Sequence, residues 1–583
     1  MNFFRKVLAS CLGTTLAIIL ITFLGFFLVG IVASSFGNTD KVTVTSNSIL
    51  KINLEDAVKD YVPVTDDPFT MLFEEDSFQL SEVLNAIENA KYDDNIQGIS
   101  IEGGFINAGI SQTQAIRNKL LEFKDTGKFI TSYADFYTQK NYYLSSVSDS
   151  IYVTPYGMVD FKGLSSERLF YKDFQDKYGV KMEVIRHGKY KSAVEGYLDN
   201  KMSDANREQI SSFLNSIWSE FVDDIAVSRN MSVEELNVLA DELQGRDSDI
   251  AVASNLLDGA IYKDEYNEVL EELAGDEYKS VNIADYISTG KGRIRTTSSN
   301  KIAILYAQGN ILYGKGDESY IGQESMIKAI RKIKKDSKIK AVVLRVNSPG
   351  GVALTADLIW RELELLKQEK TLVVSMGNYA ASGGYYIACN ADKIFAEPTT
   401  ITGSIGVFGT IPNFSGLAKN IGINAEQVST NKNSMGYSPY EPMTKDFYNV
   451  TKEGIERVYT TFLNRVAEGR NMTYDQVDEV AQGRVWTGKE ALEVGLVDEL
   501  GSLDDAIAAA AELAELDSYK TSNYPRYKKD FEDSFKGFPF MSIKENMMEK
   551  EMGEANYKIY KEVQAMSQLE GIQMLLPYEI DIK

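Results

Sequence analysis

Two short segments of the chain combine a tight turn with groups that could transfer an acyl group. In NYAASGGYYIACN (Asn378–Asn390), Ser382 directly precedes two glycines, and in NSPGGV the residues Gly350 and Gly351 follow an apolar run. Glycine permits positive φ and a close approach of substrate, and free backbone N–H groups can hold a developing oxyanion. A serine hydroxyl attacks a carbonyl only when a neighbouring base removes its proton. Plainer alternatives are a strand-to-helix turn for the glycines and a helix N-cap for Ser382.

Both segments lie between a strand-like run and a helix-like run. AVVLRV and TLVVSMG are continuous apolar stretches, whereas MIKAIRKIKKD and LIWRELELLKQ are amphipathic with helical spacing. Strands that alternate with helices predict a parallel sheet with crossover helices, which is an α/β domain. Two such turns one strand apart would have their ends close together, and this proximity favours an acyl-transfer site.

The chain repeats itself. DDNIQGISIEGG, from Asp93, parallels DSKIKAVVLRVN, from Asp336, and KNYYLSSVSDSIYVTP parallels GGYYIACNADKIFAEP, both at a separation of 243 positions. SRNMSVEELNVLA parallels GRNMTYDQVDEVA at a separation of 241 positions. A nearly constant offset indicates two copies of one domain. Gln139 and Lys140 stand in the first copy where Ser382 and Gly383 stand in the second, so the first copy lacks the serine.

The N-terminus predicts a membrane anchor. Arg5 and Lys6 precede TTLAIILITFLGFFLVGIVASSF, and no charged residue occurs from Val7 to Thr39. A helix needs about 20 apolar residues to cross a bilayer core of about 30 Å, and basic residues before it favour a cytoplasmic N-terminus. A cleaved signal peptide, with an apolar region of about 7–15 residues, is the alternative.

We divide the chain into four parts on these patterns. They are the cytoplasmic N-terminus and transmembrane anchor (1–40), the first repeat (41–290), the second repeat (291–525) and a helical C-terminal extension (526–583). A polar, glycine- and serine-bearing stretch, ISTGKGRIRTTSSNK, links the two repeats.

Composition excludes several kinds of site. The net charge of −23 argues against a nucleic-acid partner, because phosphate binding needs clustered Lys and Arg. One histidine and two cysteines make a zinc site or a disulfide framework improbable. The glycines of TGSIGVFG do not follow the GxGxxG order of a dinucleotide site. We therefore expect no metal and no organic cofactor.

Four motifs, in order, resemble those of the signal peptide peptidase A (protease IV) family of membrane-bound serine proteases. They are GKYKSAVEGY in the first copy and NSPGG, GNYAASGGYYIA and TGSIGVFG in the second. The resemblance covers nearly the full chain. It implies two tandem crotonase-like (Clp protease-like) domains behind the N-terminal helix. It also implies a Ser–Lys dyad with Ser382 as nucleophile and Lys191 as general base, and with Ser404 orienting the lysine.

The resemblance further implies an oxyanion hole made by the backbone N–H groups of Gly351 and Gly383, with Gly350 as an alternative to Gly351. Lys191 must be neutral to act as a base. Lowering a lysine pKa from about 10.4 to about 7 costs about 4–5 kcal/mol, and burial between the two domains would provide the shift.

Other bases and nucleophiles remain in the sequence. His187 and Lys189 lie close to the lysine of the motif, although the family dyad uses no histidine. Ser429-Thr430-Asn431-Lys432 has the SxxK spacing of penicillin-binding proteins but lacks their companion motifs.

The function implied by the resemblance is a membrane-anchored serine endopeptidase that degrades cleaved signal peptides and other unfolded peptides. It implies a homotetramer in the bacterial cytoplasmic membrane, single-pass, with the catalytic domains on the extracytoplasmic (periplasmic) side. An acyl-CoA-binding crotonase-like enzyme and a catalytically silent membrane scaffold are the alternatives. The sequence leaves open the cleavage-site preference, and whether serine and lysine meet within one chain or across subunits.

Overall fold

The computed structural model describes residues 12–21, 23–24, 43–63, 76–275, 277–294, 296–527 and 572–576. The chain falls into two compact units, and nearly all of the described elements belong to the unit made of 45–63, 77–527 and 558–583. Residues 12–21 are helical and belong to the other unit. Much of the predicted anchor and most of the predicted C-terminal extension lie outside the described residues. Among the helices that are described, none combines the length and the apolar character needed to cross a membrane.

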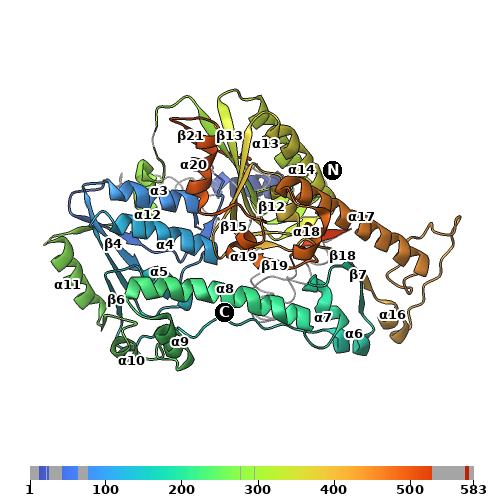
Figure 1. The fold of residues 1–583 in the computed structure, drawn as a ribbon, viewed down its shortest axis with the longest axis horizontal. Helices are drawn as coiled ribbons and strands as arrows, with labels where there is room; N and C mark the ends of the chain where they lie inside the picture. Colours follow the sequence, from blue (N-terminus) through green and yellow to red (C-terminus); the bar gives the residue numbers. More distant parts are fainter. Residues whose placement is uncertain are drawn as a thin grey trace, which may run out of the picture. The chain divides into compact units, whose positions relative to one another are not determined.

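The first copy builds a six-stranded parallel sheet in the order β8-β6-β5-β4-β1-β9. Two of its strands, β4 and β6, are labelled in Figure 1. Its strands are β1 (Ser48–Ile52), β4 (Ile96–Glu102), β5 (Phe129–Ala134), β6 (Ser150–Val153), β8 (Gly259–Ala260) and β9 (Lys279–Asn282). The α-helices between Leu80 and Tyr286 are α3 (Leu80–Lys91), α4 (Ile110–Lys124), α5 (Gln139–Ser145), α6 (Lys172–Tyr178), α7 (Glu195–Leu198), α8 (Asp204–Arg229), α9 (Val233–Asp241), α10 (Ser248–Ala253), α11 (Lys263–Ala274) and α12 (Ile283–Tyr286). A small sheet of β2 (Ala57–Lys59) and β3 (Ser77–Gln79) precedes α3.

The second copy builds an eight-stranded sheet whose main path is β19-β17-β15-β13-β10-β21. Its strands are β10 (Lys301–Gln308), β13 (Ile339–Ser348), β15 (Thr371–Ala381), β16 (Lys393–Ala396), β17 (Ile401–Gly403), β19 (Val485–Thr487), β20 (Glu499–Leu500) and β21 (Lys520–Tyr524). Its helices are α13 (Gln323–Lys335), α14 (Ala353–Lys367), α15 (Gly383–Ala388), α16 (Ser415–Asn420), α17 (Lys445–Arg470), α18 (Tyr474–Val480), α19 (Gly488–Glu493) and α20 (Leu503–Leu513).

A third sheet joins parts of both copies, in the order β12-β11-β14-β22-β18-β7. Its strands are β7 (Lys181–His187), β11 (Asn310–Leu312), β12 (Tyr320–Gly322), β14 (Gly350–Val352), β18 (Val407–Asn413) and β22 (Gln573–Leu575). Strand β7 of the first copy pairs antiparallel with β18 of the second along seven residue pairs. Where we expected a helical extension, residues 573–575 form β22, and the other described residues of that region are not helical.

The structure confirms the duplication. Helix α4 of the first copy corresponds to α14 of the second, and both have 15 residues. Helix α8 corresponds to α17, and both have 26 residues and end at an asparagine in the left-handed conformation. Strand β6 corresponds to β16 at the offset of 243 positions that the sequence predicts.

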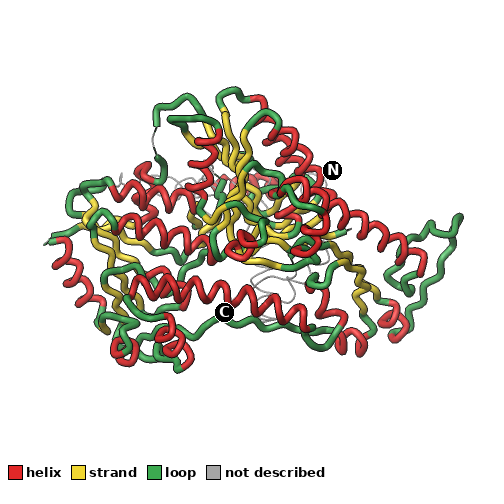
Figure 2. Tube along the Cα trace, in the orientation of Figure 1, coloured by secondary structure: helices red, strands yellow, loops and turns green. Residues whose placement is uncertain are grey.

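The apolar runs form strands that are buried on both faces, as expected for a parallel sheet between helices. Along β10, alternate residues point to opposite faces: Ile302 and Ile304 pack in a cluster with α20, whereas Ala303 and Leu305 pack in a cluster with α13 and α14. Figure 2 shows helices on both sides of these strands. This layering fixes the positions of the carboxyl ends of β13 and β15, where the NSPGG turn and the turn at Ser382 lie.

Candidate active site

Ser382 lies at the sharp turn between β15 and α15. Its backbone has φ 54° and ψ −113°, a sparsely populated conformation for a residue with a Cβ. The backbone N–H of Ser382 donates to the carbonyl of Gly403 at 2.8 Å. Ser382 occupies the N-cap position of α15, but its side chain makes no capping hydrogen bond. The plain N-cap interpretation therefore does not account for this hydroxyl.

Lys191 follows β7 in the first copy, and its amine reaches Ser382 in the second. The Nζ atom lies 2.9 Å from Ser382 Oγ, 2.9 Å from Ser404 Oγ and 3.1 Å from the Ser404 carbonyl oxygen. All three side chains have no exposed surface. Burial disfavours the charged amine and holds the pKa of Lys191 well below its usual range. The structure thus brings the three predicted side chains together within one chain.

The surroundings of Lys191 include two residues of the TGSIGVFG motif and one residue, Gly483, that the sequence reasoning missed. A Cβ on Gly483 would lie 2.7 Å from Lys191 Cβ, and a Cβ on Gly406 would lie 3.2 Å from Lys191 Cδ. The Phe408 ring centroid lies 5.9 Å from Nζ. These residues seal the lysine stem from water, which is the physical source of the lowered pKa. Gly483 belongs to no motif of the resemblance, so its proximity to Lys191 had no signature in the sequence.

Gln209, on α8, holds the lysine-bearing turn against the second copy. Its Nε2 donates to the Tyr190 carbonyl at 3.1 Å and to Ser192 Oγ at 2.8 Å, and its Oε1 accepts from the Val485 N–H at 3.3 Å. Its side chain is fully buried. Figure 1 shows α8 running past β19, where Ser216 Oγ lies 2.8 Å from Thr487 Oγ1. The first copy therefore supplies both the lysine and the helix that fixes its position.

The glycines of NSPGG adopt backbone conformations that other residues avoid. Gly350 has φ 101° and Gly351 has φ 152°. A Cβ on Gly350 would lie 2.6 Å from the Gly383 backbone nitrogen, and a Cβ on Gly383 would lie 3.1 Å from the Gly351 nitrogen. The two predicted oxyanion donors, Gly351 and Gly383, thus lie beside each other, and side chains are excluded from the space between them.

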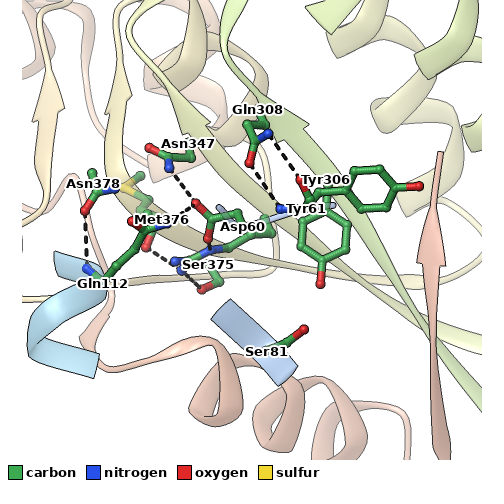
Figure 3. A network of polar contacts seen from close by, with 12 residues as sticks. Asp60, Tyr61, Ser81, Gln112, Tyr306, Gln308, Asn347, Ser375, Met376 and Asn378 are labelled. Carbon is green, nitrogen blue, oxygen red and sulfur yellow. Dashed lines mark hydrogen bonds and ion pairs between the residues drawn. The ribbon is translucent and has the colours of Figure 1, made fainter. Parts of the chain in front are cut away.

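A buried polar network supports both turns (Figure 3). Asp60 Oδ1 accepts from Arg345 Nε at 2.7 Å, and Asp60 Oδ2 accepts from the amide of Asn347. Asn347 Oδ1 accepts from the Tyr379 N–H at 3.2 Å. Asn347 directly precedes the Ser-Pro-Gly-Gly turn, and Tyr379 lies three residues before Ser382. The network therefore ties the oxyanion turn to the strand that carries the serine.

The same network reaches the first copy. Gln112, on α4, donates to Asp60 Oδ2 at 3.0 Å, and its backbone N–H donates to Asn378 Oδ1 at 3.2 Å. Asp60 and Arg345 have 1% and 2% of their side-chain surface exposed. Asp60 lies directly after β2, in a segment that contains none of the motifs, so the sequence reasoning missed it.

The rival bases have other partners. The His187 ring stacks on Tyr459, with centroids 3.9 Å apart, and its Nδ1 lies 2.6 Å from Glu456 Oε2. The Lys189 amine lies 4.8 Å from the Tyr190 ring centroid. Of these three candidate bases, all within the described residues, Lys191 is the one that hydrogen-bonds to Ser382 Oγ.

The SxxK stretch and the first copy's counterpart of the serine also have structural roles. Lys432 forms an exposed ion pair with Asp446. Gln139, which replaces the serine in the first copy, accepts from the backbone N–H groups of Lys162 and Gly163, both at 2.9 Å. The first copy therefore uses the turn to hold a loop.

Comparisons with known proteins agree on a family. The sequence profile of peptidase family S49 matches residues 122–276 and 364–517, one segment in each copy. Protease 4 of Haemophilus influenzae is 35% identical over 519 residues, which cover 85% of this chain and 84% of that protein. Protease 4 of Salmonella typhi is 35% identical over 459 residues, which cover 76% of this chain and 74% of that protein.

A plant protein and a solved structure are also similar. The chloroplastic serine protease SPPA of Arabidopsis thaliana is 34% identical over 437 residues, covering 73% of this chain and 64% of that protein. The structure of a ClpP1 mutant from Listeria monocytogenes matches 36% of this chain and 95% of its own, with 16% identity and a TM-score of 0.24, too low to assign a fold. On the profile match in both copies and the two Protease 4 relatives, the chain belongs to peptidase family S49 and is a serine protease.

Proposed function

We propose that this protein is a membrane-anchored endopeptidase that uses a Ser382–Lys191 dyad to degrade signal peptides. The observation that carries the proposal is the 2.9 Å separation of Lys191 Nζ and Ser382 Oγ in a site from which water is excluded. A lysine with a lowered pKa is neutral for a larger fraction of the time, and only the neutral amine has a lone pair to accept a proton.

The neutral amine has two N–H donors and one lone pair. The two N–H groups donate hydrogen bonds to the side-chain oxygen and the carbonyl oxygen of Ser404, which lie 2.9 and 3.1 Å from Nζ. The lone pair then points to the Ser382 hydroxyl. Ser382 Oγ attacks the scissile carbonyl while Lys191 takes its proton. Lys191 returns that proton to the leaving amine, and then activates the water that hydrolyses the acyl-enzyme.

The backbone N–H groups of Gly351 and Gly383 hold the oxyanion of the tetrahedral intermediate. Removing one such donor in other hydrolases costs about 10²–10³ in kcat. Gly350 is the alternative donor to Gly351, but its N–H already donates to Ser348 Oγ at 3.1 Å.

The names of relatives support signal peptides as substrates. A protein from Enterococcus faecium with the provisional name signal peptide peptidase SppA is 32% identical over 246 residues, which cover 41% of this chain and 72% of that protein. We extend the proposal to the anchor in residues 1–40, to a homotetramer, and to an extracytoplasmic position of the two domains. The basic residues before the apolar segment support that orientation. Neither acyl-CoA binding nor a silent scaffold gains support from the peptidase family match.

The test uses the full chain in detergent micelles with a fluorogenic signal-peptide substrate. Ser382→Ala and Lys191→Ala should each lower kcat/KM by about 10⁴-fold or more, with circular dichroism unchanged. Lys189→Ala is the matched control, because Lys189 is exposed, lies two residues from Lys191 and directs its amine to the Tyr190 ring, and it should keep full activity. Full activity in Lys191→Ala with loss in His187→Gln would refute the dyad.

A further inference from the structure

Strand β22 (Gln573–Leu575) fills a gap in the third sheet, between β14 and β18. It runs antiparallel to both of these strands. The neighbours β14 and β18 have no pairing with each other in the described sheet, so β22 is what connects the two halves. Proteins often bind an extended peptide in this way, as an added strand whose main chain makes the hydrogen bonds.

The register of β22 places one carbonyl group at the proposed oxyanion donors. Met574 stands opposite Gly351. Leu576 N–H donates to the Pro349 carbonyl at 2.6 Å, and Ala353 N–H donates to the Ile572 carbonyl at 3.1 Å. These bonds make Pro349–Leu576 and Ala353–Ile572 hydrogen-bonded pairs of the antiparallel ladder. Because every second pair in such a ladder is hydrogen-bonded, the pair midway between them, Gly351–Met574, is hydrogen-bonded as well.

The close approaches of the glycines agree with this register. The Met574 carbonyl oxygen lies 2.2 Å from where a Cβ of Gly350 would be, and 3.0 Å from where a Cβ of Gly383 would be. The oxygen thus occupies the space that only glycines leave open beside the Gly383 N–H. A carbonyl oxygen beside the Gly351 and Gly383 N–H groups lies where the carbonyl oxygen of a substrate's scissile bond would bind.

The side chains of the segment are buried as those of a bound peptide would be. Met574 has no exposed surface and packs in the core cluster of the second copy. Leu576, two residues on, is 3% exposed and packs in a cluster that includes residues of the first copy. Side chains two apart on a strand share a face, so both enter the protein on the same side. One of these two buried positions holds an unbranched apolar side chain and the other a γ-branched one.

We propose that the gap between β14 and β18 is the groove that binds peptide substrates as an added strand, and that residues 572–576 occupy it as a built-in competitor. The Met574 carbonyl takes the place of the scissile carbonyl. This inference rests on the proposed function of Ser382 and deepens it. Substrate hydrolysis requires β22 to leave the groove, so the segment sets the apparent affinity for apolar peptides.

The first experiment compares the full chain with a chain ending at Gly571, both in the same detergent. A tethered segment acts at an effective concentration on the order of 1 mM. If the free segment has an inhibition constant of about 0.1 mM, the shortened chain should show about tenfold higher kcat/KM. Met574→Asp in the full chain should give a similar rise, because a carboxylate is not accommodated in a fully buried apolar site. Leu513→Asp, at an exposed apolar residue of α20, is the matched control and should change nothing.

A free peptide tests the groove without altering the chain. The peptide GIQMLLPY should inhibit the shortened chain competitively, and the same peptide with aspartate in place of methionine should inhibit at least about tenfold more weakly. Equal kcat/KM in all chains, together with no inhibition by the peptide, would overturn the proposal.

Labelling of Ser382 by a fluorophosphonate separates this proposal from the proposed function. The probe needs no peptide substrate, so it reports on access to the serine even if no signal peptide is hydrolysed. Faster labelling of the shortened chain supports occupation of the groove, and addition of GIQMLLPY should slow it. Equal labelling rates in the two chains would refute the occupation, whatever the substrate of the enzyme is.

Discussion

Lys191 Nζ lies 2.9 Å from Ser382 Oγ, although the two residues are 191 positions apart and belong to different copies of one duplicated domain. Neither copy alone contains the pair. The contact between the copies also removes water from the lysine, and this burial is what lowers its pKa. The duplication therefore supplies the base, which lies on the first copy. It also supplies the buried environment that lowers the pKa of Lys191, so that a larger fraction of its amine is neutral and can accept a proton.

The pH dependence of hydrolysis should follow the amine of Lys191. Because only the neutral form accepts the serine proton, kcat/KM should rise with pH through the lowered pKa of Lys191 and be lost below it. The measurement is kcat/KM between about pH 5 and pH 10, with a substrate that has no ionisable side chain. Lys189→Ala should leave the profile unchanged. A midpoint that moves in His187→Gln would instead assign the base to the histidine.

Ser404→Ala should slow catalysis without weakening substrate binding. Ser404 Oγ lies 2.9 Å from Lys191 Nζ, and its loss leaves the amine held by one fewer acceptor. Misplacement of a catalytic group by about 1 Å can cost about 100-fold, so we expect kcat to fall about 10–100-fold with KM unchanged. Ser434→Ala, at an exposed serine, is the control. A rise in KM at constant kcat would mean that Ser404 contacts substrate instead of positioning the lysine.

Much of the fold follows from local patterns in the sequence. The apolar runs AVVLRV and TLVVSMG form β13 and β15, and the offset of 243 positions places α4 and α14 in register. Short motifs were enough to predict Ser382, the glycines of the NSPGG turn and Lys191, because each motif encodes a turn or a reactive group. The division of the chain at residues 40, 290 and 525, and the crotonase-like assignment, stay predictions.

Contacts between distant segments could not be predicted in this way. Gly483 lies against Lys191 only because β19 folds beside the lysine-bearing turn, and no local pattern records that approach. Asp60 directly follows the three-residue strand β2, and its partner Arg345 is 285 positions away. Strand β22 has three residues and belongs to a region that composition alone describes as helical. Such contacts are set by packing across the whole chain, not by periodicity.

Asp60→Asn should destabilise the folded chain strongly. The change leaves the Arg345 guanidinium, with 2% of its side chain exposed, without its carboxylate partner. Breaking a buried ion pair from one side costs about 3–5 kcal/mol, and we expect a loss of that size in urea unfolding. Glu362→Gln is the matched control, because its partner Arg331 is largely exposed, and it should cost much less than Asp60→Asn. A loss for Asp60→Asn as small as that of the control would show that the network does not stabilise the turns.

Glu397→Gln should stabilise the protein at alkaline pH. Glu397 directly follows β16 and is 2% exposed, and in the described part of the chain its Oε1 has no hydrogen-bond partner. Burial raises the pKa of this carboxyl to about 8, partly offset by Arg345 and reinforced by Asp505 and Asp504. The folded state therefore binds more protons than the unfolded state between the two pKa values, so the free energy of unfolding should fall as pH rises from about 4.5 to about 8, by about 1 kcal/mol per pH unit.

The glutamine variant cannot ionise, so this slope should be absent from its stability. We expect Glu397→Gln to have the same melting temperature as the wild type at about pH 5 and a higher one at about pH 9, because only the wild type must bury a charge or take up a proton there. Glu479→Gln, at an exposed carboxylate, should follow the wild type at both values. If the difference between Glu397→Gln and the wild type were the same at both pH values, the carboxyl would not titrate in this range, and its burial would be matched by a partner that stabilises the charge.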